Sequence, residues 1–400
     1  MGGSSGSTAG NAGRAGRGGT TDSGDNAGSG GTTDGGDTAD GGDTANGGGT
    51  ADGGGTAGSD VGGSGGSSGG GGEDPFVWVS AGELHSCGVT RGRKLYCWGD
   101  NTLGALGDNT VYSRSRPARV GRDADWDRVS AGRDSSCGIR AGQIWCWGNL
   151  QPDPSGSATG QPTRAPVRIG SDANWDAVGV GAGFACGKRQ TTIWCWGLNP
   201  ALQLGSVGPD SAVPVAITSD GNFDSLSVGR SHGCGIRGGQ LFCWGAGPTG
   251  GSQNLPSRVG DAADWQAVSA GADYTCGIRS GALYCWGTSQ SGELGFGPEQ
   301  QTTIVPTRVG SASDWDGIAA GYNHTCGTRA GTLYCWGSPV YGATGIAAQS
   351  TDVIEPTAVG TSTQWQGLEL GGDHSCGLRE GQLYCWGSNV QGQLGSGPGG

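Results

Sequence analysis

Cys376-Gly-Leu-Arg-Glu-Gly-Gln-Leu-Tyr-Cys-Trp-Gly387 is the stretch of sequence that decides the fold. Six further copies of this pattern precede it, at a spacing of about fifty residues. A repeat period of about forty to fifty residues, with several short strands in each unit, is typical of a β-propeller. The seven copies therefore predict an all-β protein, a seven-bladed β-propeller of four-stranded antiparallel blades.

Each copy contains two cysteines that frame a β-hairpin. In Cys137 to Cys146, hydrophobic residues flank Ala141-Gly142, which predicts a two-residue turn. This register places Cys137 opposite Cys146 as a non-hydrogen-bonded pair, with Cα atoms roughly 4.5 Å apart, within reach of a disulfide. The predicted disulfides are Cys87–Cys97, Cys137–Cys146, Cys186–Cys195, Cys234–Cys243, Cys276–Cys285, Cys326–Cys335 and Cys376–Cys385.

Two hairpins depart from the pattern. Cys87 and Cys97 are one residue further apart, which predicts a three-residue loop around Gly92. The third hairpin has Gln190-Thr191 at its centre, with no glycine to adopt a positive φ.

The same register pairs a glycine with an aromatic residue in every hairpin, as in Gly138 opposite Trp145. An aromatic ring that covers a strand glycine helps to hold register. The other tryptophans follow the second cysteine or open the preceding strand. We assign to that opening position Trp78, Trp126, Trp175, Trp265, Trp315 and Trp365, with Phe223 in the one gap. We therefore interpret all fifteen tryptophans as packing residues.

A Pro-x-x-Val or Pro-x-x-Ile segment supplies the fourth strand, because proline is tolerated at a sheet edge. There are seven hairpins but only six such segments, which begin at Pro117, Pro166, Pro214, Pro256, Pro306 and Pro356. We expect the remaining blade to be completed by residues near Pro75, or to remain an incomplete final sheet.

Composition divides the chain into a tail, residues 1–75, and a propeller, residues 76–400. The tail is rich in Gly, Ser, Thr and Asp and predicts a disordered tether. It carries ten acidic residues and two arginines of a chain whose net charge is −12. Such a charge lacks the basic footprint of a nucleic-acid-binding protein. No apolar run approaches the length of a transmembrane helix.

The matched cysteine pairs indicate an oxidising compartment, so we expect an extracellular or cell-surface location, periplasmic or tethered to an outer membrane. Met1-Gly-Gly-Ser-Ser-Gly6 shows no export signal. A lipid anchor upstream of the given start, followed by the flexible tail, is our hypothesis for the export route.

Residues that suggest catalysis or metal binding recur at equivalent repeat positions. His85, His232, His324 and His374 each lie two residues before the first cysteine of a unit. A metal-binding ring is one interpretation, but Ser135 and Phe184 replace histidine in other units, which favours structural hydrogen bonding. No catalytic motif occurs within the repeats. We predict no enzyme activity, no catalytic residue, no metal and no cofactor.

Ser80-Ala-Gly-Glu-Leu-His-Ser-Cys87 and Cys97-Trp-Gly-Asp-Asn-Thr-Leu-Gly-Ala-Leu-Gly107 resemble the regulator of chromosome condensation repeat. The resemblance covers about residues 76–400 and implies a seven-bladed propeller. The paired cysteines look like the disulfide-bearing variant of exported bacterial members. Founding members of the family are nucleotide exchange factors for a small nuclear GTPase. Other relatives are a secreted bacterial inhibitor of β-lactamases and the plant ultraviolet-B photoreceptor.

The segments that follow each Trp-Gly vary most, and loops on a rigid scaffold commonly carry function. Our candidate binding residues in these loops are Tyr112, Arg114, Arg116, Asp153, Glu299 and Tyr341. We predict a monomeric, non-catalytic extracellular propeller that binds an unidentified protein. The alternatives are an intracellular exchange factor or scaffold, and a purely structural surface repeat.

Overall fold

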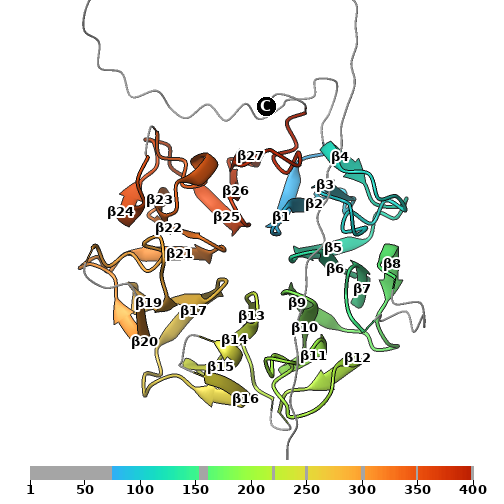
Figure 1. Cartoon of the computed structure of the whole chain (residues 1–400), viewed down its shortest axis with the longest axis horizontal. Helices are drawn as coiled ribbons and strands as arrows, with labels where there is room; N and C mark the ends of the chain where they lie inside the picture. Colours follow the sequence, from blue (N-terminus) through green and yellow to red (C-terminus); the bar gives the residue numbers. More distant parts are fainter. Residues whose placement is uncertain are drawn as a thin grey trace, which may run out of the picture. The chain divides into compact units, whose positions relative to one another are not determined.

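The computed structural model describes residues 74–152, 161–218, 221–247, 251–298, 302–347 and 350–397. Seven antiparallel sheets surround a central axis, each forming one blade (Figure 1). Six blades have four strands, and the seventh has three within the described residues. The predicted all-β seven-bladed propeller is confirmed. The tail prediction concerns residues that lie almost entirely outside the described ranges, so the domain boundary at residue 75 stays a prediction.

The strands follow one another around the ring in sequence order. Blade 1 contains β1 (Phe76–Ala81), β2 (His85–Thr90), β3 (Leu95–Gly99) and β4 (Arg114–Arg119). Blade 2 contains β5 (Trp126–Ala131), β6 (Ser135–Arg140), β7 (Gln143–Gly148) and β8 (Thr163–Arg168). Blade 3 contains β9 (Trp175–Val180), β10 (Phe184–Arg189), β11 (Thr192–Gly197) and β12 (Ser211–Ala216). Blade 4 contains β13 (Ser227–Val228), β14 (His232–Arg237), β15 (Gln240–Gly247) and β16 (Gly251–Arg258).

The remaining blades repeat this order. Blade 5 contains β17 (Trp265–Ala270), β18 (Tyr274–Arg279), β19 (Ala282–Thr288) and β20 (Thr302–Arg308). Blade 6 contains β21 (Trp315–Ala320), β22 (His324–Arg329), β23 (Thr332–Gly337), the short 3-10 helix η1 (Val340–Gly342) and β24 (Val353–Ala358). Blade 7 contains β25 (Trp365–Leu370), β26 (His374–Arg379) and β27 (Gln382–Gly387).

The hairpin register is the one that the sequence predicts. All seven cysteine pairs lie directly opposite each other and form disulfides, with Cα–Cα distances of 4.0–4.1 Å. The longer first hairpin closes through a three-residue loop, in which Arg93 rather than Gly92 adopts the positive φ, at 58°. In the third hairpin Gln190 takes a φ of 56°, as Ala141 does with 48° at the equivalent position, and Thr191 stands where the second hairpin has Gly142 with a φ of 71°.

The cross-strand pairing of each glycine with an aromatic residue is also confirmed. However, the ring that covers the glycine is not that of its cross-strand partner but that of the aromatic residue that opens the innermost strand. At Gly138 the nearest atoms to an added Cβ belong to Trp126, the residue that opens the innermost strand. In blade 1 this position is held by Phe76, whose ring lies over Gly88. The assignment of Trp78 to the opening position is therefore wrong. The indole Nε1 of Trp78 instead donates to the carbonyl oxygen of Val129 in blade 2.

Arginine connects these aromatic rings to the carboxylates that flank them. Arg140 stacks on Trp126 and Trp145 and forms ion pairs with Asp123 and Asp125. Equivalent stacking recurs at Arg189, Arg237, Arg279, Arg329 and Arg379. The recurring carboxylates thus hold guanidinium groups against aromatic faces, which stabilises the hairpin end of the blade.

Neighbouring blades are joined where the loop after the third strand meets the next blade. The Trp147 indole donates to the Ala105 carbonyl oxygen of the preceding blade at 2.7 Å. The same bond joins Trp244 to Gln203, Trp336 to Glu293, Trp386 to Ala343 and Trp98 to Gln393. Trp196 and Trp286 have no such partner among the described residues. They follow blades 2 and 4. In the five loops that supply an acceptor, the amide of a glycine closes a turn on the carbonyl three residues before it, at Gly107, Gly205, Gly295, Gly345 and Gly395, and the described residues of blades 2 and 4 form no such turn. This glycine-closed turn therefore presents the accepting carbonyl.

A second set of interblade hydrogen bonds uses the histidines. His85 Nε2 lies 2.8 Å from the hydroxyl of Ser136 in the next blade, and that hydroxyl donates to the Ala105 carbonyl oxygen. Because the serine proton is engaged, His85 must donate from Nε2. His232, His324 and His374 make equivalent contacts with Thr275, Ser375 and Ser86. The predicted structural role of the histidines is thus confirmed by their hydrogen bonds.

Glycines form the innermost contacts between blades. One glycine follows each inner strand, and each is within reach of its counterpart in the next blade. They are Gly82, Gly132, Gly181, Gly229, Gly271, Gly321 and Gly371. A Cβ added at any of them would come no more than 2.9 Å from the carbonyl oxygen of the following glycine. The next residue donates its amide around the ring, as in Glu83 to the Gly132 oxygen at 3.0 Å.

The ring closes between blades 7 and 1 through the same contacts. The Gln393 carbonyl accepts from Trp98 and Ser86, and the Gly397 amide donates to the Ser115 oxygen. Residues near Pro75 do not complete blade 7, because β1 is the innermost strand of blade 1. The incomplete final sheet is therefore the correct alternative within the described residues.

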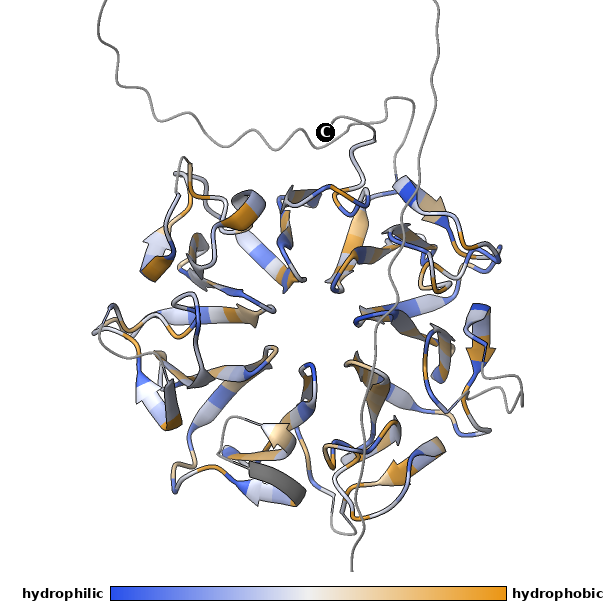
Figure 2. Ribbon diagram, viewed as in Figure 1, coloured by the Kyte–Doolittle hydropathy of each residue, from blue (hydrophilic) through white to orange (hydrophobic). Residues whose placement is uncertain are grey.

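The core is distributed among the blades rather than gathered at one centre. Hydrophobic and hydrophilic residues both occur in every blade (Figure 2). Each hydrophobic cluster joins neighbouring blades, as where Trp147 packs with Leu106 and Trp126. Six of the seven tryptophans that follow the second cysteine are at most 1 % exposed, and Trp386 is the partly exposed one.

Replacing a tryptophan whose indole donates to a loop carbonyl of the preceding blade should destabilise the protein more than replacing a tryptophan without this hydrogen bond. We expect Trp336→Phe to cost about 1 kcal/mol more than Trp286→Phe, because only Trp336 loses an indole hydrogen bond. Both side chains are fully buried, so the loss of packing is matched. The measurement is urea-induced unfolding of the oxidised proteins. Equal urea midpoints for the two variants would contradict a stabilising role for the indole hydrogen bond of Trp336.

Acid should destabilise the propeller through its buried histidines. Burial lowers the pKa of His85, His232 and His324 from 6.5 to about 4. Burial, and then the nearby His324 and His85, lower the pKa of His374 to about 3. The folded state therefore stays neutral where the unfolded chain binds protons, so stability is present above about pH 6.5 and is lost as pH falls toward 4. We expect a loss of about 1 to 3 kcal/mol for each histidine.

The control for this prediction is His324→Tyr, which copies the tyrosine at the equivalent position in blade 5. Tyr274 there contacts the Thr325 hydroxyl and donates to the His324 carbonyl. The variant should lose less stability than the wild type between pH 6.5 and 4. Parallel pH profiles of the melting temperature would refute the role of His324.

Candidate functional site

One face of the propeller carries all the long loops. The turn between the first and second strands and the loop between the third and fourth strands lie together, as where the Asp100 amide donates to the Leu84 oxygen. The opposite face carries the hairpin turns and their arginine–carboxylate pairs. We call the first of these the loop face.

The loop face contains three of the six candidate residues that the sequence predicts, Tyr112, Arg114 and Tyr341. Tyr112 is 71 % exposed in the loop of blade 1, and Tyr341 is 64 % exposed in η1 of blade 6. Arg114 pairs with Asp108 at 2.8 Å and stabilises its own loop. Arg116 is exposed on β4. The other two candidates, Asp153 and Glu299, lie outside the described residues, so their part in binding remains a prediction.

Exposed hydrophobic side chains on this face include Val207 in the loop of blade 3, which is 73 % exposed, and a group that spans three consecutive blades. Val340 and Tyr341 lie in blade 6, Val390 lies in blade 7, and Tyr112 lies in blade 1. Val390 is 72 % exposed. Blade 7 stands between the other two (Figure 1). We name these four residues the 6–7–1 arc. Large apolar and tyrosine side chains held out into solvent by a rigid scaffold are typical of protein-binding surfaces.

Several charged side chains lie near the mouth of the central channel on the same face. Arg133 Nε lies 3.4 Å from the carboxylates of both Glu83 and Asp134. Arg230 stands over the Tyr322 ring at 5.9 Å from its centroid. Burial raises the pKa of the Tyr322 hydroxyl, and the neighbouring Glu83 raises it further, so the phenol stays protonated.

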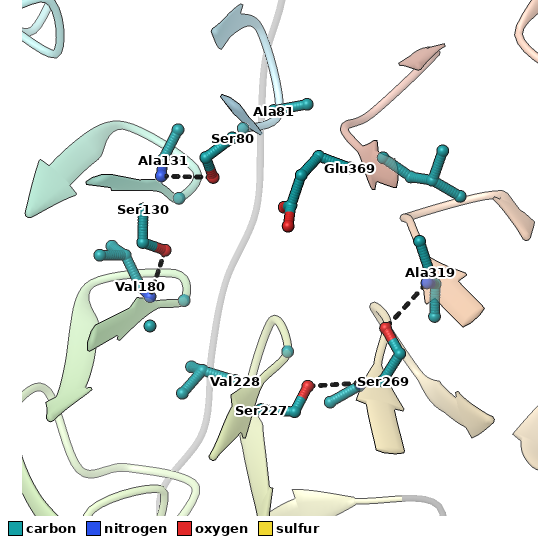
Figure 3. A pocket seen from close by; sticks show the side chains of 18 of the residues that line it. Ser80, Ala81, Ser130, Ala131, Val180, Ser227, Val228, Ser269, Ala319 and Glu369 are labelled. Carbon is teal, nitrogen blue, oxygen red and sulfur yellow. Dashed lines mark hydrogen bonds between the residues drawn. The ribbon is translucent and has the colours of Figure 1, made fainter. Parts of the chain in front are cut away.

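The channel itself is a cavity of about 330 Å³ lined by the seven inner strands. Serine hydroxyls on its wall accept hydrogen bonds from the next blade, as from the Ala131 amide to Ser80 at 3.0 Å and from the Val180 amide to Ser130 at 3.1 Å. Glu369 occupies the equivalent position in blade 7, and its carboxyl group points into the opening (Figure 3). It is the only carboxylate among the residues that line the cavity.

The channel perturbs the acidity of Glu369. Burial raises the pKa of this carboxyl from 4.5 to about 8. Its side chain is partly exposed to the channel, but the surrounding inner strands separate it from bulk water, so the neutral acid is favoured. A neutral carboxylic acid in the channel can both donate and accept a hydrogen bond.

Neither a metal cluster nor a membrane-spanning helix is present in the part of the chain that the structure describes. No three His, Cys, Asp or Glu side chains of these residues lie close enough together to hold a metal ion. No described helix is long and apolar enough to cross a bilayer.

The sequence interpretation missed Glu369 and Val390. Glu369 lies two residues before the inner-strand glycine, where the other repeats have Ser80, Ser130, Gly179, Ser227, Ser269 and Ala319. Comparing this position across the seven repeats reveals the single charge. Val390 was missed because its loop otherwise matches the repeat pattern closely, although the corresponding residue in blade 1 is Thr102.

Comparison with protein families identifies the repeat. Models of the regulator of chromosome condensation repeat match residues 280–327, 77–105 and 367–393. The chain therefore contains repeats of this type, as the sequence motifs predict. The comparison with curated proteins found no match.

Solved structures share the fold at low sequence identity. Yeast RCC1 (Prp20), bound to Kap60, is 18 % identical, with a TM-score of 0.67 over 80 % of this chain and 82 % of that chain. Human WBSCR16 is 18 % identical, with a TM-score of 0.68 over 77 % and 88 %. A second structure of Prp20p from Saccharomyces cerevisiae, described with its binding to Gsp1p and histones, has a TM-score of 0.64, with 18 % identity over 79 % and 83 %. At this identity the likeness establishes the fold alone.

Replacing the ionisable carboxyl group of Glu369 should change how stability depends on pH. The raised pKa means that the unfolded chain releases a proton above about pH 4.5 while the folded chain retains it up to about pH 8. The wild type should therefore lose stability relative to Glu369→Gln as pH rises through this range. Melting temperatures of both proteins at pH 4.5, 6, 7 and 8 provide the measurement. A difference in melting temperature between the two proteins that does not change with pH would contradict the raised pKa of Glu369.

Proposed function

We propose that this protein is a non-catalytic, extracellular or cell-surface propeller that binds a partner protein through the 6–7–1 arc of its loop face. The observation that supports binding most strongly is the group of exposed Tyr and Val side chains on three consecutive blades. Tyrosine presents a large contact area at small conformational cost, and such residues commonly dominate binding energy.

The disulfides support the proposed location. All fourteen cysteines of the sequence are paired within their own blades. Disulfides of this number persist in oxidising compartments and are rare in the cytosol. They weigh against the alternative of an intracellular exchange factor, for which the structural likeness offers only a shared fold.

The histidines support a non-catalytic role. All four are at most 1 % exposed, and each is engaged with the hydroxyl of a neighbouring blade. Such side chains are not available to a substrate. The channel carboxyl Glu369 lies among serines whose oxygens already accept backbone amides.

Photo-crosslinking on intact native cells tests the proposed surface. A benzoylphenylalanine placed at residue 112 or 341 should capture a protein partner, whereas the same probe at Ser311, exposed on the opposite face, should not. Tyr112→Ala combined with Tyr341→Ala should weaken capture by a tagged wild-type probe protein about tenfold or more. The double variant should retain its melting temperature, since both side chains are mostly exposed.

Val305→Ala is the matched control, because Val305 is 59 % exposed but lies on the side wall in β20. Equal capture by the wild type and the double variant would overturn the assignment of the 6–7–1 arc. Reactive thiols in protein taken from its native cells without reduction would overturn the extracellular location.

A further inference from the structure

One position on the wall of the central channel holds a serine in four blades and a carboxyl group in blade 7. In blades 1, 2, 4 and 5 the serine oxygen accepts a hydrogen bond from a backbone amide of the next blade, at 2.9–3.1 Å. Glu369 takes this position in blade 7, and its side chain points into the opening instead (Figure 3). Blade 7 thus has an ionisable group where other blades have an interblade hydrogen bond.

This exchange leaves a backbone amide of blade 1 without an acceptor. The Gly82 amide donates to β2, so the preceding residue, Ala81, occupies a non-hydrogen-bonded position and its amide points away from β2. The equivalent amide of Ala131 donates to Ser80, whereas no described group accepts from the amide of Ala81. Buried backbone groups are seldom left unpaired. A residue that breaks the repeat at a cost to the fold is typical of a functional site.

The carboxyl group of Glu369 also lacks a partner. Within the described ranges no hydrogen bond or ion pair reaches it, and burial raises its pKa to about 8. The other charged groups on the cavity wall are the guanidinium groups of Arg128 and Arg230. Arg128 stacks over Trp78 and Arg230 over Tyr322, at 4.9 and 5.9 Å from the ring centroids. Neither pairs with Glu369, so the described wall supplies no cation for this carboxyl group.

The cavity has the size and the lining of a site for a small molecule. Its volume of about 330 Å³ lies at the lower end of the range of roughly 300 to 1,000 Å³ that is usual for ligand pockets. Apolar residues such as Ala319 and Val228 contribute to its wall. A serine oxygen has two lone pairs, so Ser80 and its equivalents can each accept a second hydrogen bond.

These features favour an organic cation over a metal ion. A divalent metal ion requires several oxygen or nitrogen ligands, and Glu369 is the only carboxylate on the described wall. A primary ammonium group donates three hydrogen bonds, which one carboxylate and two wall oxygens can accept. An aliphatic chain attached to it matches the apolar residues of the cavity.

We propose that the central channel binds a small aliphatic primary amine, whose ammonium group pairs with the carboxylate of Glu369. The ligand supplies the missing cation, and its remaining N–H groups donate to wall oxygens such as that of Ser80. Because the carboxyl group must be ionised to form this pair, binding at neutral pH releases a proton from Glu369.

The first test is calorimetric titration of the full chain with n-butylammonium chloride at pH 7 and pH 9. Glu369 changes from about one-tenth to about nine-tenths ionised over this range, so we expect the affinity to rise about tenfold. The amine keeps its charge, as a lysine side chain does. Arg128 and Arg230 stay charged, and burial raises the pKa of Tyr322, so Glu369 is the one group on the described cavity wall that titrates here.

The second test replaces the carboxyl group. Glu369→Gln retains the shape of the side chain without the charge and should bind butylammonium at least tenfold more weakly than the wild type at pH 9. Its matched control is Ala319→Ser, which places the serine of the repeat at the equivalent position of blade 6 and keeps Glu369. This control should bind butylammonium as the wild type does.

Glu369→Ser provides a variant whose folding is not in doubt. It restores the residue of the repeat and gives the Ala81 amide an acceptor, as Ser80 does for Ala131. We expect it to raise the melting temperature and to abolish binding of butylammonium.

Several results would overturn the proposal. Failure of the wild type to bind butylammonium at millimolar concentration at pH 9 is one, and equal binding by Glu369→Gln is another. An affinity that is the same at pH 7 and pH 9 would show that the carboxylate of Glu369 does not form the pair. Equal binding of 1-butanol would mean that charge plays no part, and displacement by calcium chloride at equal concentration would indicate a metal site.

A lysine side chain of a partner protein carries the same ammonium group as a free amine. Nα-acetyl-lysine methylamide distinguishes the two sources, because its backbone must enter the cavity together with the side chain. It should bind more weakly than butylammonium. Tighter binding would assign the site to a lysine side chain and overturn the assignment to a free amine.

This inference does not rest on the proposed 6–7–1 arc. Tyr112→Ala with Tyr341→Ala should leave binding of butylammonium unchanged, while Glu369→Gln should leave cell-surface crosslinking through residue 112 unchanged. Failure of one proposal can thus be told from failure of the other.

Discussion

The close approach of seven glycines around the axis is the constraint on which the propeller depends. Each would place a Cβ against a carbonyl oxygen of the next blade, so a side chain at any one would push two blades apart. The amide that follows each glycine donates to the neighbouring blade, and this ring of backbone bonds fixes the spacing of the inner strands. That spacing brings the buried histidines within reach of the hydroxyls opposite them, and it determines the width of the channel that Glu369 enters.

Variation between the repeats is coupled across blade boundaries. Where the loop of a blade forms the glycine-closed turn, the next blade's tryptophan has an acceptor. Blades 2 and 4 lack this turn among the described residues, and there the indoles of Trp196 and Trp286 have no acceptor. The histidine position behaves similarly. Phe184 replaces histidine where the facing residue in the next blade is Gly233, which has no hydroxyl to offer. The unit that is maintained is therefore the interface between blades rather than the single repeat.

Local pairing in this fold could be read from the sequence, whereas contacts between repeats could not. Hairpin register follows from turn length and cysteine spacing, so Cys137 opposite Cys146 was predictable. The opening position of blade 1 was misassigned to Trp78 because a tryptophan was expected, although Phe76 has the correct spacing from Cys87. The count of six Pro-x-x-Val or Pro-x-x-Ile segments shows that one blade lacks this type of fourth strand. It does not show how that blade is completed, because residues near Pro75 could also have supplied the strand. Exposure of Tyr112 and Tyr341 agrees with their choice as loop candidates, but the perturbed carboxyl of Glu369 depends on burial by seven separate strands.

The disulfides have a consequence for how the chain acquires its covalent structure. Every bridge joins cysteines that are nine or ten residues apart, and none crosses from one blade to another. Correct pairing therefore requires only that a local hairpin has formed, long before the ring can close. Cysteines can be oxidised in order as each repeat emerges, with little competition from those of earlier repeats. A duplicated or deleted repeat would likewise leave every remaining bridge with its own partner, so the number of blades can change without disturbing the oxidation pattern.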